Sequence, residues 1–267
     1  MGEHLLFENS FGAFTVASRG ASLLSLQIDG RELLHDFGDQ WQDWASGSVM
    51  FPFPVRMSSG SVMKFEGKEY HWPINDEKHR AALHGLTPWE KFELSETSCG
   101  IEATWTYDGS KDYYPFPCVL TINYSLEKSC LVLTSKVENL GDVHMPYHLG
   151  WHPYFKVGTV PTIEPSPNHR LVKNEVSHPG AKIPFHGFDW QKEVDGAFYM
   201  SEIHIVNHAY RLQIEPISAI TQIFRPADAP FIAVEPITGL GHPEFAWRTV
   251  APGCYDQAVS SIRLSWL

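Results

Sequence analysis

The sequence has no long apolar run. Nowhere do its 267 residues contain the roughly 18 consecutive apolar side chains that a membrane-spanning helix needs. The first ten residues, MGEHLLFENS, also lack the basic region and the sustained apolar core of an export signal. We therefore expect a soluble protein that is located in the cytoplasm and does not insert into a membrane.

Basic residues are also scarce. Lys and Arg number 20 against 31 Asp and Glu, which gives a formal net charge of −11. No Lys-rich or Arg-rich stripe offsets this charge locally, so the surface repels the phosphates of nucleic acids and anionic lipid headgroups alike. Neither a nucleic acid nor a membrane is an expected partner.

Cysteine residues are scarce as well. The four cysteines are widely spaced and form no CxxC pair, which excludes a disulfide scaffold and offers no cysteine-based metal motif. We expect free thiols in a reducing compartment, in agreement with the cytoplasmic prediction. These residues are Cys99, Cys118, Cys130 and Cys254.

No segment matches a long amphipathic helix, and the 19 prolines interrupt most attempts to draw one. Turn signals such as IDGREL (28–33) and FEGKEY (65–70) instead separate short runs rich in β-branched and aromatic residues, such as CVLTINYSL (118–126). The pattern predicts an all-β protein, a sandwich or barrel of many antiparallel strands. The length suits one domain over residues 1–267, with a long surface loop at residues 158–170.

Three histidines occur at helical spacing, since His144, His148 and His152 are four residues apart. On a helix they would share one face and suggest a metal site. Pro146 and Pro153 oppose that helix, because proline lacks the amide donor and biases the preceding residue toward extended backbone. We predict a strand and a rigid extended turn there, and no metal.

The extended backbone would place His152 beside Trp151 and Tyr154, on the wall of an aromatic-lined pocket. Such walls suit sugars, whose C–H faces pack on aromatic rings while their hydroxyls take hydrogen bonds. The alternative is a core histidine that is bonded to the backbone.

A second candidate is Glu235 in FIAVEP, where four apolar residues lead to a carboxylate at a strand end. Burial and nearby charges can tune such a group into an acid or a base. Glu215 in the similar IEPI stretch follows an alternating polar run and is expected to be solvated. The alternative for Glu235 is a carboxylate that is satisfied by backbone amides in a turn.

Three further residues complete the candidate set. Arg56 follows a Pro/Phe run, His84 lies in ALHGL, and Asp195 lies in VDGAF, where Asp-Gly itself favours a tight turn.

In chain order, these motifs resemble those of the aldose 1-epimerases, or galactose mutarotases. The first group is Arg56, Gly67, Tyr70, Asn75 and LHG (83–85). The motifs that follow it along the chain are HPYF (152–155), Asp195 of VDGAF, EPITG (235–239) and PG (252–253). The resemblance covers most of the chain and implies the large antiparallel β-sandwich of that family.

The resemblance also implies a reaction. Glu235 would act as general base on the anomeric hydroxyl, and a protonated His152 would act as general acid on the ring oxygen of an aldohexose. Substrate binding would fall to the family positions His84, Arg56, Asp195 and Asn75, with Trp151 in the aromatic wall. No cofactor and no metal is needed, the expected partner is a small sugar, and the protein would be a monomer or homodimer.

Several alternatives remain open at this stage. Where many family members carry Asn before the arginine, this chain has Val55, so the sugar is undefined. A hexose 6-phosphate is the alternative substrate if loop cations converge on the pocket. Other classes are a non-catalytic carbohydrate-binding protein on the same sandwich and a metal-dependent, cupin-like enzyme. The loop cations are Lys78, Arg80, Arg170 and Lys173.

Overall fold

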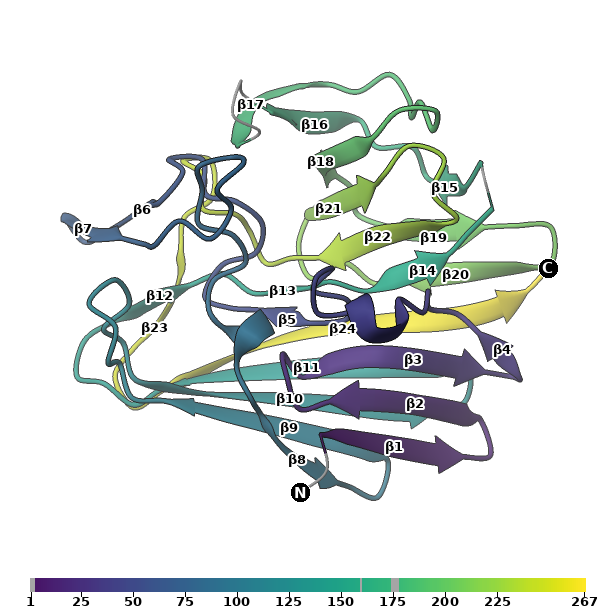
Figure 1. Ribbon diagram of the computed structural model, residues 1–267, viewed down its shortest axis with the longest axis horizontal. Helices are drawn as coiled ribbons and strands as arrows, with labels where there is room; N and C mark the ends of the chain where they lie inside the picture. Colours follow the sequence, from purple (N-terminus) through teal and green to yellow (C-terminus); the bar gives the residue numbers. More distant parts are fainter. Residues whose placement is uncertain (1–2, 159, 174–177) are drawn as a thin grey trace.

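The computed structural model describes residues 3–158, 160–173 and 178–267. Antiparallel strands dominate the described part of the chain, and its helical elements are two short 3₁₀ turns, η1 (Gly38–Gln40) and η2 (Thr87–Trp89). Figure 1 shows the strands gathered into stacked sheets. The all-β prediction is confirmed.

The largest sheet has eight strands, in the spatial order β15-β19-β20-β24-β11-β10-β9-β8. In Figure 1 it runs from β8 at the bottom to β15 at the upper right. Its strands are β8 (Glu93–Glu96), β9 (Gly100–Tyr107), β10 (Cys118–Glu127), β11 (Cys130–Asn139), β15 (Thr162–Glu164), β19 (Ile203–Val206), β20 (Tyr210–Ile214) and β24 (Tyr255–Trp266).

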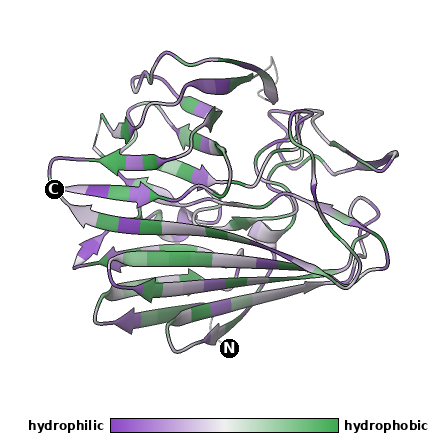
Figure 2. Ribbon diagram, turned by 180° about the vertical axis from the view of Figure 1, so that it is seen from behind, coloured by the Kyte–Doolittle hydropathy of each residue, from purple (hydrophilic) through white to green (hydrophobic). Residues whose placement is uncertain are grey.

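Strand β10 shows why these residues form a sheet. Its alternate residues Leu120, Ile122, Tyr124 and Leu126 are at most 1% exposed, while the residues between them are half-buried. Successive side chains of a strand point to opposite faces, so the alternation read from the sequence turns one face toward the core. Figure 2 shows the same alternation of apolar and polar residues on the long strands.

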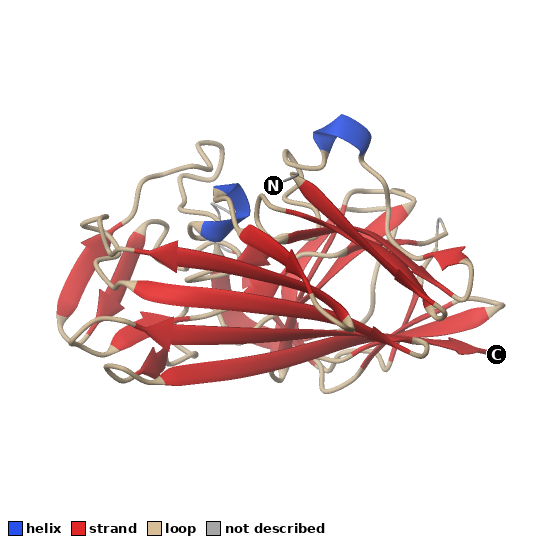
Figure 3. Ribbon diagram, turned by 90° about the horizontal axis from the view of Figure 1, so that it is seen from below, coloured by secondary structure: helices blue, strands red, loops and turns tan. Residues whose placement is uncertain are grey.

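A four-stranded N-terminal sheet packs on this apolar face. The Tyr124 hydroxyl donates to the Ala21 carbonyl over 2.7 Å, and the Phe14 ring lies 6.2 Å from the Tyr124 ring. Figure 3 shows this sheet crossing the long strands. The strands are β1 (His4–Asn9), β2 (Gly12–Ala17), β3 (Ser22–Ile28) and β4 (Arg31–Glu32).

A third, six-stranded sheet occupies the upper half of Figure 1, in the order β14-β22-β21-β18-β16-β17. Its strands are β14 (Tyr154–Lys156), β16 (His169–Lys173), β17 (Pro179–Pro184), β18 (Val194–Tyr199), β21 (Ile220–Arg225) and β22 (Phe231–Pro236). Three strand pairs complete the fold: β5 (Val49–Met50) with β13 (Gly150–Trp151), β12 (Met145–Tyr147) with β23 (Arg248–Val250), and β6 (Val62–Phe65) with β7 (Lys68–His71).

Two local predictions are wrong. Residues 158–170 are not one loop, because they include β15 and the start of β16; prolines 161 and 165 flank β15 at the edge of its sheet, where proline is tolerated. VDGAF is not a turn, because Asp195 lies within β18 opposite Phe224 of β21. Pairing along both edges of β18 outweighs the local turn preference of Asp-Gly.

Two further features complete the description of the fold. In the described part of the chain, no helix is long and apolar enough to cross a membrane. The four cysteines are free, with Cys118 and Cys130 buried and Cys99 and Cys254 exposed.

Ile122 tests the assignment of the β10 core face. We expect Ile122→Ala to lower the free energy of unfolding by about 2–5 kcal/mol, because it removes a fully buried side chain and leaves a cavity. Asn123→Ala, on the half-buried face, should change it by only about 0.5 kcal/mol. Urea unfolding of the three proteins measures both values, and equal losses would contradict the assignment.

Candidate functional site

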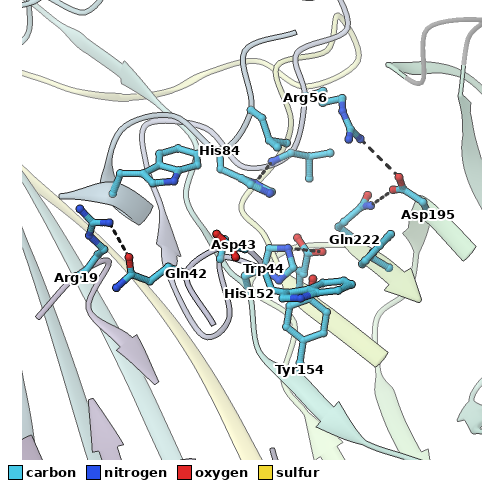
Figure 4. Close-up of a pocket in the computed structure, with 16 residues that line it drawn as sticks. Arg19, Gln42, Asp43, Trp44, Arg56, His84, His152, Tyr154, Asp195 and Gln222 are labelled. Carbon is cyan, nitrogen blue, oxygen red and sulfur yellow. Dashed lines mark hydrogen bonds and ion pairs between the residues drawn. The ribbon is translucent and has the colours of Figure 1, made fainter. Parts of the chain in front are cut away.

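A pocket of about 390 Å³ opens along one face of the six-stranded sheet (Figure 4). Its floor follows from the register of the strands. Glu235 of β22 is opposite Gln222 of β21, Tyr154 of β14 is opposite Ala233 of β22, and Asp195 of β18 is two residues from the partner of Gln222. Since residues i and i+2 share a face, these side chains of four strands lie on the same face of the sheet, in two neighbouring rows.

Loop residues Val55 and His84 line the pocket opposite the sheet, and two hydrogen bonds join them to each other. The Val55 amide donates to His84 Nδ1 over 3.1 Å, and the His84 amide donates to the Val55 carbonyl over 3.1 Å. Both have left-handed backbone, with φ of 59° and 61°, which is unusual for a β-branched residue such as Val55. Because Nδ1 accepts a bond, His84 carries its proton on Nε2, as a donor for a ligand.

His152 and Glu235 meet at the centre of the pocket. His152 Nε2 lies 3.4 Å from Glu235 Oε1, and the two residues are 5% and 1% exposed. The His152 ring stacks on Tyr154 at 4.9 Å and meets the His84 ring edge-on at 5.2 Å. Its backbone is fixed as well, since the His152 amide donates to the Ser48 carbonyl over 3.0 Å. The geometry is that of a rigid acid/base pair.

The chain on either side explains why this pair meets. Gly150, before His152, forms a bridge to Ile237, after Glu235, and a Cβ on Gly150 would come within 2.9 Å of the Ile237 side chain. A Cβ on Gly239 would come within 2.4 Å of the His148 ring. Two glycines thus let the HLGWH and EPITG segments approach closely enough to bring the imidazole to the carboxylate.

Burial sets the protonation of the histidines. It lowers the pKa of His152 to about 4 and that of His148 to about 3. Burial also lowers the pKa of His84 well below its usual value, with further lowering by the positive charge of His152 and Arg56. All three imidazoles are therefore neutral at pH 7 in the folded chain. A carboxylate that faces an imidazole at 3.4 Å favours the charged form of that imidazole, which opposes the effect of burial on His152.

Arg56 is held between two carboxylates. Its Nε donates to Asp76 Oδ2 over 2.6 Å, and its Nη1 lies 3.6 Å from Asp195 Oδ2. Asp195 in turn accepts a 2.8 Å hydrogen bond from Gln222, and Asp76 contacts His79 Nδ1 at 2.8 Å. This chain of bonds fixes a guanidinium at the edge of the pocket, where it can donate to a polar ligand.

The structure brings five of the seven predicted site residues to the pocket: Glu235, His152, His84, Arg56 and Asp195. The other two belong elsewhere. Trp151 is fully buried and donates its indole N–H to the Gly47 carbonyl over 3.0 Å, so its predicted place in the pocket wall is wrong. Asn75 is exposed and exchanges two hydrogen bonds with the Leu83 backbone, so it braces the loop before His84 and does not line the pocket.

Sequence reasoning missed Gln222, Trp44 and Asp76. Gln222 and Trp44 line the pocket, and Asp76 holds Arg56 from behind. The TQIF run around Gln222 resembles any half-buried strand, so nothing local distinguishes it.

The sequence predicted a buried Glu235 and a solvated Glu215 from the runs that precede them. The structure agrees, since Glu235 is buried and Glu215 is exposed.

The histidine series does not converge. His144 is exposed beside Glu66, His148 packs on the Trp247 ring at 4.8 Å, and His152 faces Glu235. Among the described residues, no group of three or more His, Cys, Asp or Glu side chains is placed to hold a metal ion.

The cations suggested for a phosphate also lie elsewhere. Lys78, Arg80 and Arg170 do not line the pocket, and the side chain of Lys173 lies outside the described residues. Among the described residues, the Lys and Arg side chains that line the pocket are those of Arg19 and Arg56.

The three neutral histidines make stability sensitive to acid. Their pKa values are lower in the folded chain than the unfolded value of about 6.5, so the unfolded chain binds more protons below that pH. We expect the free energy of unfolding to be constant above about pH 6.5 and to fall below it, by at most about 1.4 kcal/mol per pH unit for each histidine. Urea unfolding between pH 7.5 and 4.5 measures this slope.

A variant isolates the part of the pH dependence of stability that is due to His152. His152→Gln should reduce the slope by up to one proton, while His71→Gln, which changes an exposed histidine, should leave it unchanged. Equal slopes for His152→Gln and the parent protein would show that His152 is not held neutral by the fold.

Comparison with known proteins adds to this geometry. The family model for aldose 1-epimerase matches residues 3–192, which include Arg56, His84 and His152. Among curated proteins, YihR of Escherichia coli K12 is 31% identical over 142 residues, and YphB of the same organism is 30% identical over 114 residues. These alignments cover 52% and 42% of this chain, and the chain spans less than half the length of either relative (46% and 37%).

Solved structures extend the likeness of the fold to the whole chain. A galactose mutarotase-like protein from Clostridium acetobutylicum gives a TM-score of 0.87 at 16% identity, covering 99% of this chain and 95% of its own. The galactose 1-epimerase of Lactobacillus acidophilus gives 0.82 at 15% identity, covering 98% and 94%. Sheet architecture and family match agree, and the chain belongs to the aldose 1-epimerase family.

Proposed function

We propose that this protein is an isomerase, a mutarotase that interconverts the α and β anomers of an aldohexose without a cofactor. The observation that supports this most is the contact between the buried Glu235 and His152, which lie 3.4 Å apart at the centre of a polar, aromatic-lined pocket. The anomeric oxygen and the ring oxygen of a sugar are bonded to the same carbon. An acid and a base that serve both must therefore lie close together.

The proposed reaction needs no other reagent. Glu235 takes the proton of the anomeric hydroxyl, the C1 carbonyl forms, and the bond from C1 to the ring oxygen breaks. The ring oxygen keeps the electron pair and takes a proton from His152. Rotation about C1–C2 presents the other carbonyl face, and the same proton transfers run backward to close the ring.

The environment of His152 favours its transfer of a proton to the ring oxygen. Burial lowers the pKa of His152 to about 4, so its imidazolium is a stronger acid than an exposed one, although it is a minor species at neutral pH. The carboxylate of Glu235 offsets that scarcity, because it favours the imidazolium in its immediate neighbourhood.

The remaining polar groups suit the sugar hydroxyls. His84 offers its Nε2 proton, and Arg56 and Asp195 offer donors and acceptors that are already oriented by Asp76 and Gln222. Partners held in place before binding reduce the entropy lost when the substrate is oriented. Tyr154 contributes an aromatic surface beneath His152.

Anomer exchange measured by magnetisation-transfer NMR tests the proposal with D-galactose and D-glucose. We expect the protein to accelerate exchange well above the buffer rate. We expect Glu235→Gln to lose about 10²- to 10⁴-fold of that activity, because a positioned base contributes roughly this much.

Glu215→Gln is the matched control, since Glu215 lies in the similar IEPI stretch but is exposed. It should keep full activity, and circular dichroism should show both variants folded. Full activity in Glu235→Gln would exclude Glu235 as the base. No acceleration of any sugar by folded parent protein would favour a carbohydrate-binding protein without catalysis.

Asp76 provides a second test, as a residue that positions Arg56. Asp76→Asn keeps the side-chain shape but removes the charge behind the guanidinium, so we expect kcat/KM to fall about tenfold, mainly through a higher KM. Glu77→Gln changes the exposed neighbour and should have no effect. A loss confined to kcat would contradict a role in orienting the bound sugar.

A further inference from the structure

The glycines of the HLGWH and EPITG segments allow these segments to approach each other, but they do not fix the distance between them. A bridge joins Gly150 to Ile237, and Gly150 lacks the Cβ that would block it. Removing an obstacle permits a range of positions, whereas acid/base chemistry needs one geometry. A side chain that fixes the geometry must make directional bonds between the two segments, and Thr238 makes them.

Thr238 bonds to Leu149 at two points. The Thr238 amide donates to the Leu149 carbonyl over 2.7 Å, and the Leu149 amide donates to the Thr238 hydroxyl oxygen over 2.8 Å. With both bonds in place, Leu149 cannot slide along the EPITG segment without losing one of them. Leu149 is fully buried, so water would not readily replace a lost bond.

The Thr238 hydroxyl also faces a second residue of the HLGWH segment. Its oxygen accepts the Leu149 proton, so its own hydrogen is free to donate, and His148 Nδ1 lies 3.4 Å away. Burial lowers the pKa of His148 to about 3, so the neutral ring can accept that hydrogen at Nδ1. This contact is longer and weaker than the two bonds to Leu149, and it adds to them.

The two bonds lie close to the acid/base pair along the chain. Leu149 precedes His152 by three residues, and Thr238 follows Glu235 by three residues. The residues between them on either side, 150–151 and 236–237, are all buried. The Ile237 carbonyl also accepts a 2.7 Å hydrogen bond from the Ser218 hydroxyl. Short, buried and hydrogen-bonded spans therefore transmit the position of Thr238 and Leu149 to the imidazole and the carboxylate.

We propose that Thr238 is a positioning residue, whose hydroxyl fixes the distance between Glu235 and His152 by way of Leu149. Thr238 does not line the pocket, so it acts through the pair and not on the sugar. This inference rests on the proposed function for its kinetic test, while its NMR test does not require that any sugar reacts.

Thr238→Val tests the hydroxyl, because valine has nearly the same shape and keeps the amide but cannot accept the Leu149 proton. We expect kcat for anomer exchange to fall about tenfold or more and KM to stay within about twofold, because other bonds hold Arg56 and Asp195. Thr238→Ser restores the hydroxyl and should return kcat to within about threefold of the parent value.

Thr221→Val is the matched control. Thr221 is fully buried on β21 opposite Pro236, but its hydroxyl has no hydrogen-bond partner among the described residues. Losing this hydroxyl should leave kcat within about twofold of the parent value, and urea unfolding should show that every variant is folded in the assay.

Three kinetic results would overturn the proposal. One is an unchanged kcat in Thr238→Val. Another is a loss in Thr238→Ser as large as that in Thr238→Val, because the hydroxyl would then not be the cause. The third is an equal loss in Thr221→Val, because any buried threonine beside β22 would then have the same effect.

Nitrogen-15 NMR of the His152 ring at pH 7.5 separates the positioning role from the reaction. Glu235→Gln should change the chemical shift of Nε2 in the parent protein, because that nitrogen faces the carboxylate at 3.4 Å. The same substitution should change the shift much less when Thr238→Val is already present, because the two side chains are then no longer held together.

The two outcomes of this measurement are distinct. If no sugar reacts but the shift change is reduced in Thr238→Val, the proposed activity fails and the positioning role stands. If sugars react and the shift change is the same in both backgrounds, the positioning role fails and the activity stands.

Discussion

The contact between Glu235 and His152 requires two polar groups to be buried side by side, and much of the surrounding structure makes that possible. Removing either group from water costs free energy unless a partner is held at the right distance. The partner is supplied by close backbone packing: Gly150 against Ile237 and Gly239 against His148. The sandwich is the frame that brings these distant segments together.

The predictions from the sequence that succeeded are those that rest on a local pattern of apolar and polar residues. The face of β10 was readable because Leu120, Ile122 and their alternate neighbours repeat with the period of a strand. Glu235 could be distinguished from Glu215 because the runs before them differ in apolar character, and burial follows that difference. Arg56 and His84 were singled out from the runs around them, and the family motifs then assigned them to substrate binding.

The failures have a common physical cause, because each depends on cross-strand neighbours. Asp195 lies in a strand since β18 pairs on both edges, and Trp151 turns inward because its indole finds the Gly47 carbonyl. Gln222 and Asp76 matter only through the groups they contact, Asp195 and Arg56. Register between segments far apart in the chain is set by the whole core, which a local pattern does not contain.

The backbone of Val55, in the wall of the pocket, is strained. A β-branched residue with φ of 59° stores about 1–3 kcal/mol of backbone strain, which the mutual hydrogen bonds with His84 help to maintain. An asparagine at this position would adopt the same backbone with less strain, but it would present an amide to the pocket. Backbone stability and the polarity of the pocket wall are therefore coupled at a single residue, so the polarity of the wall can change without any change of architecture.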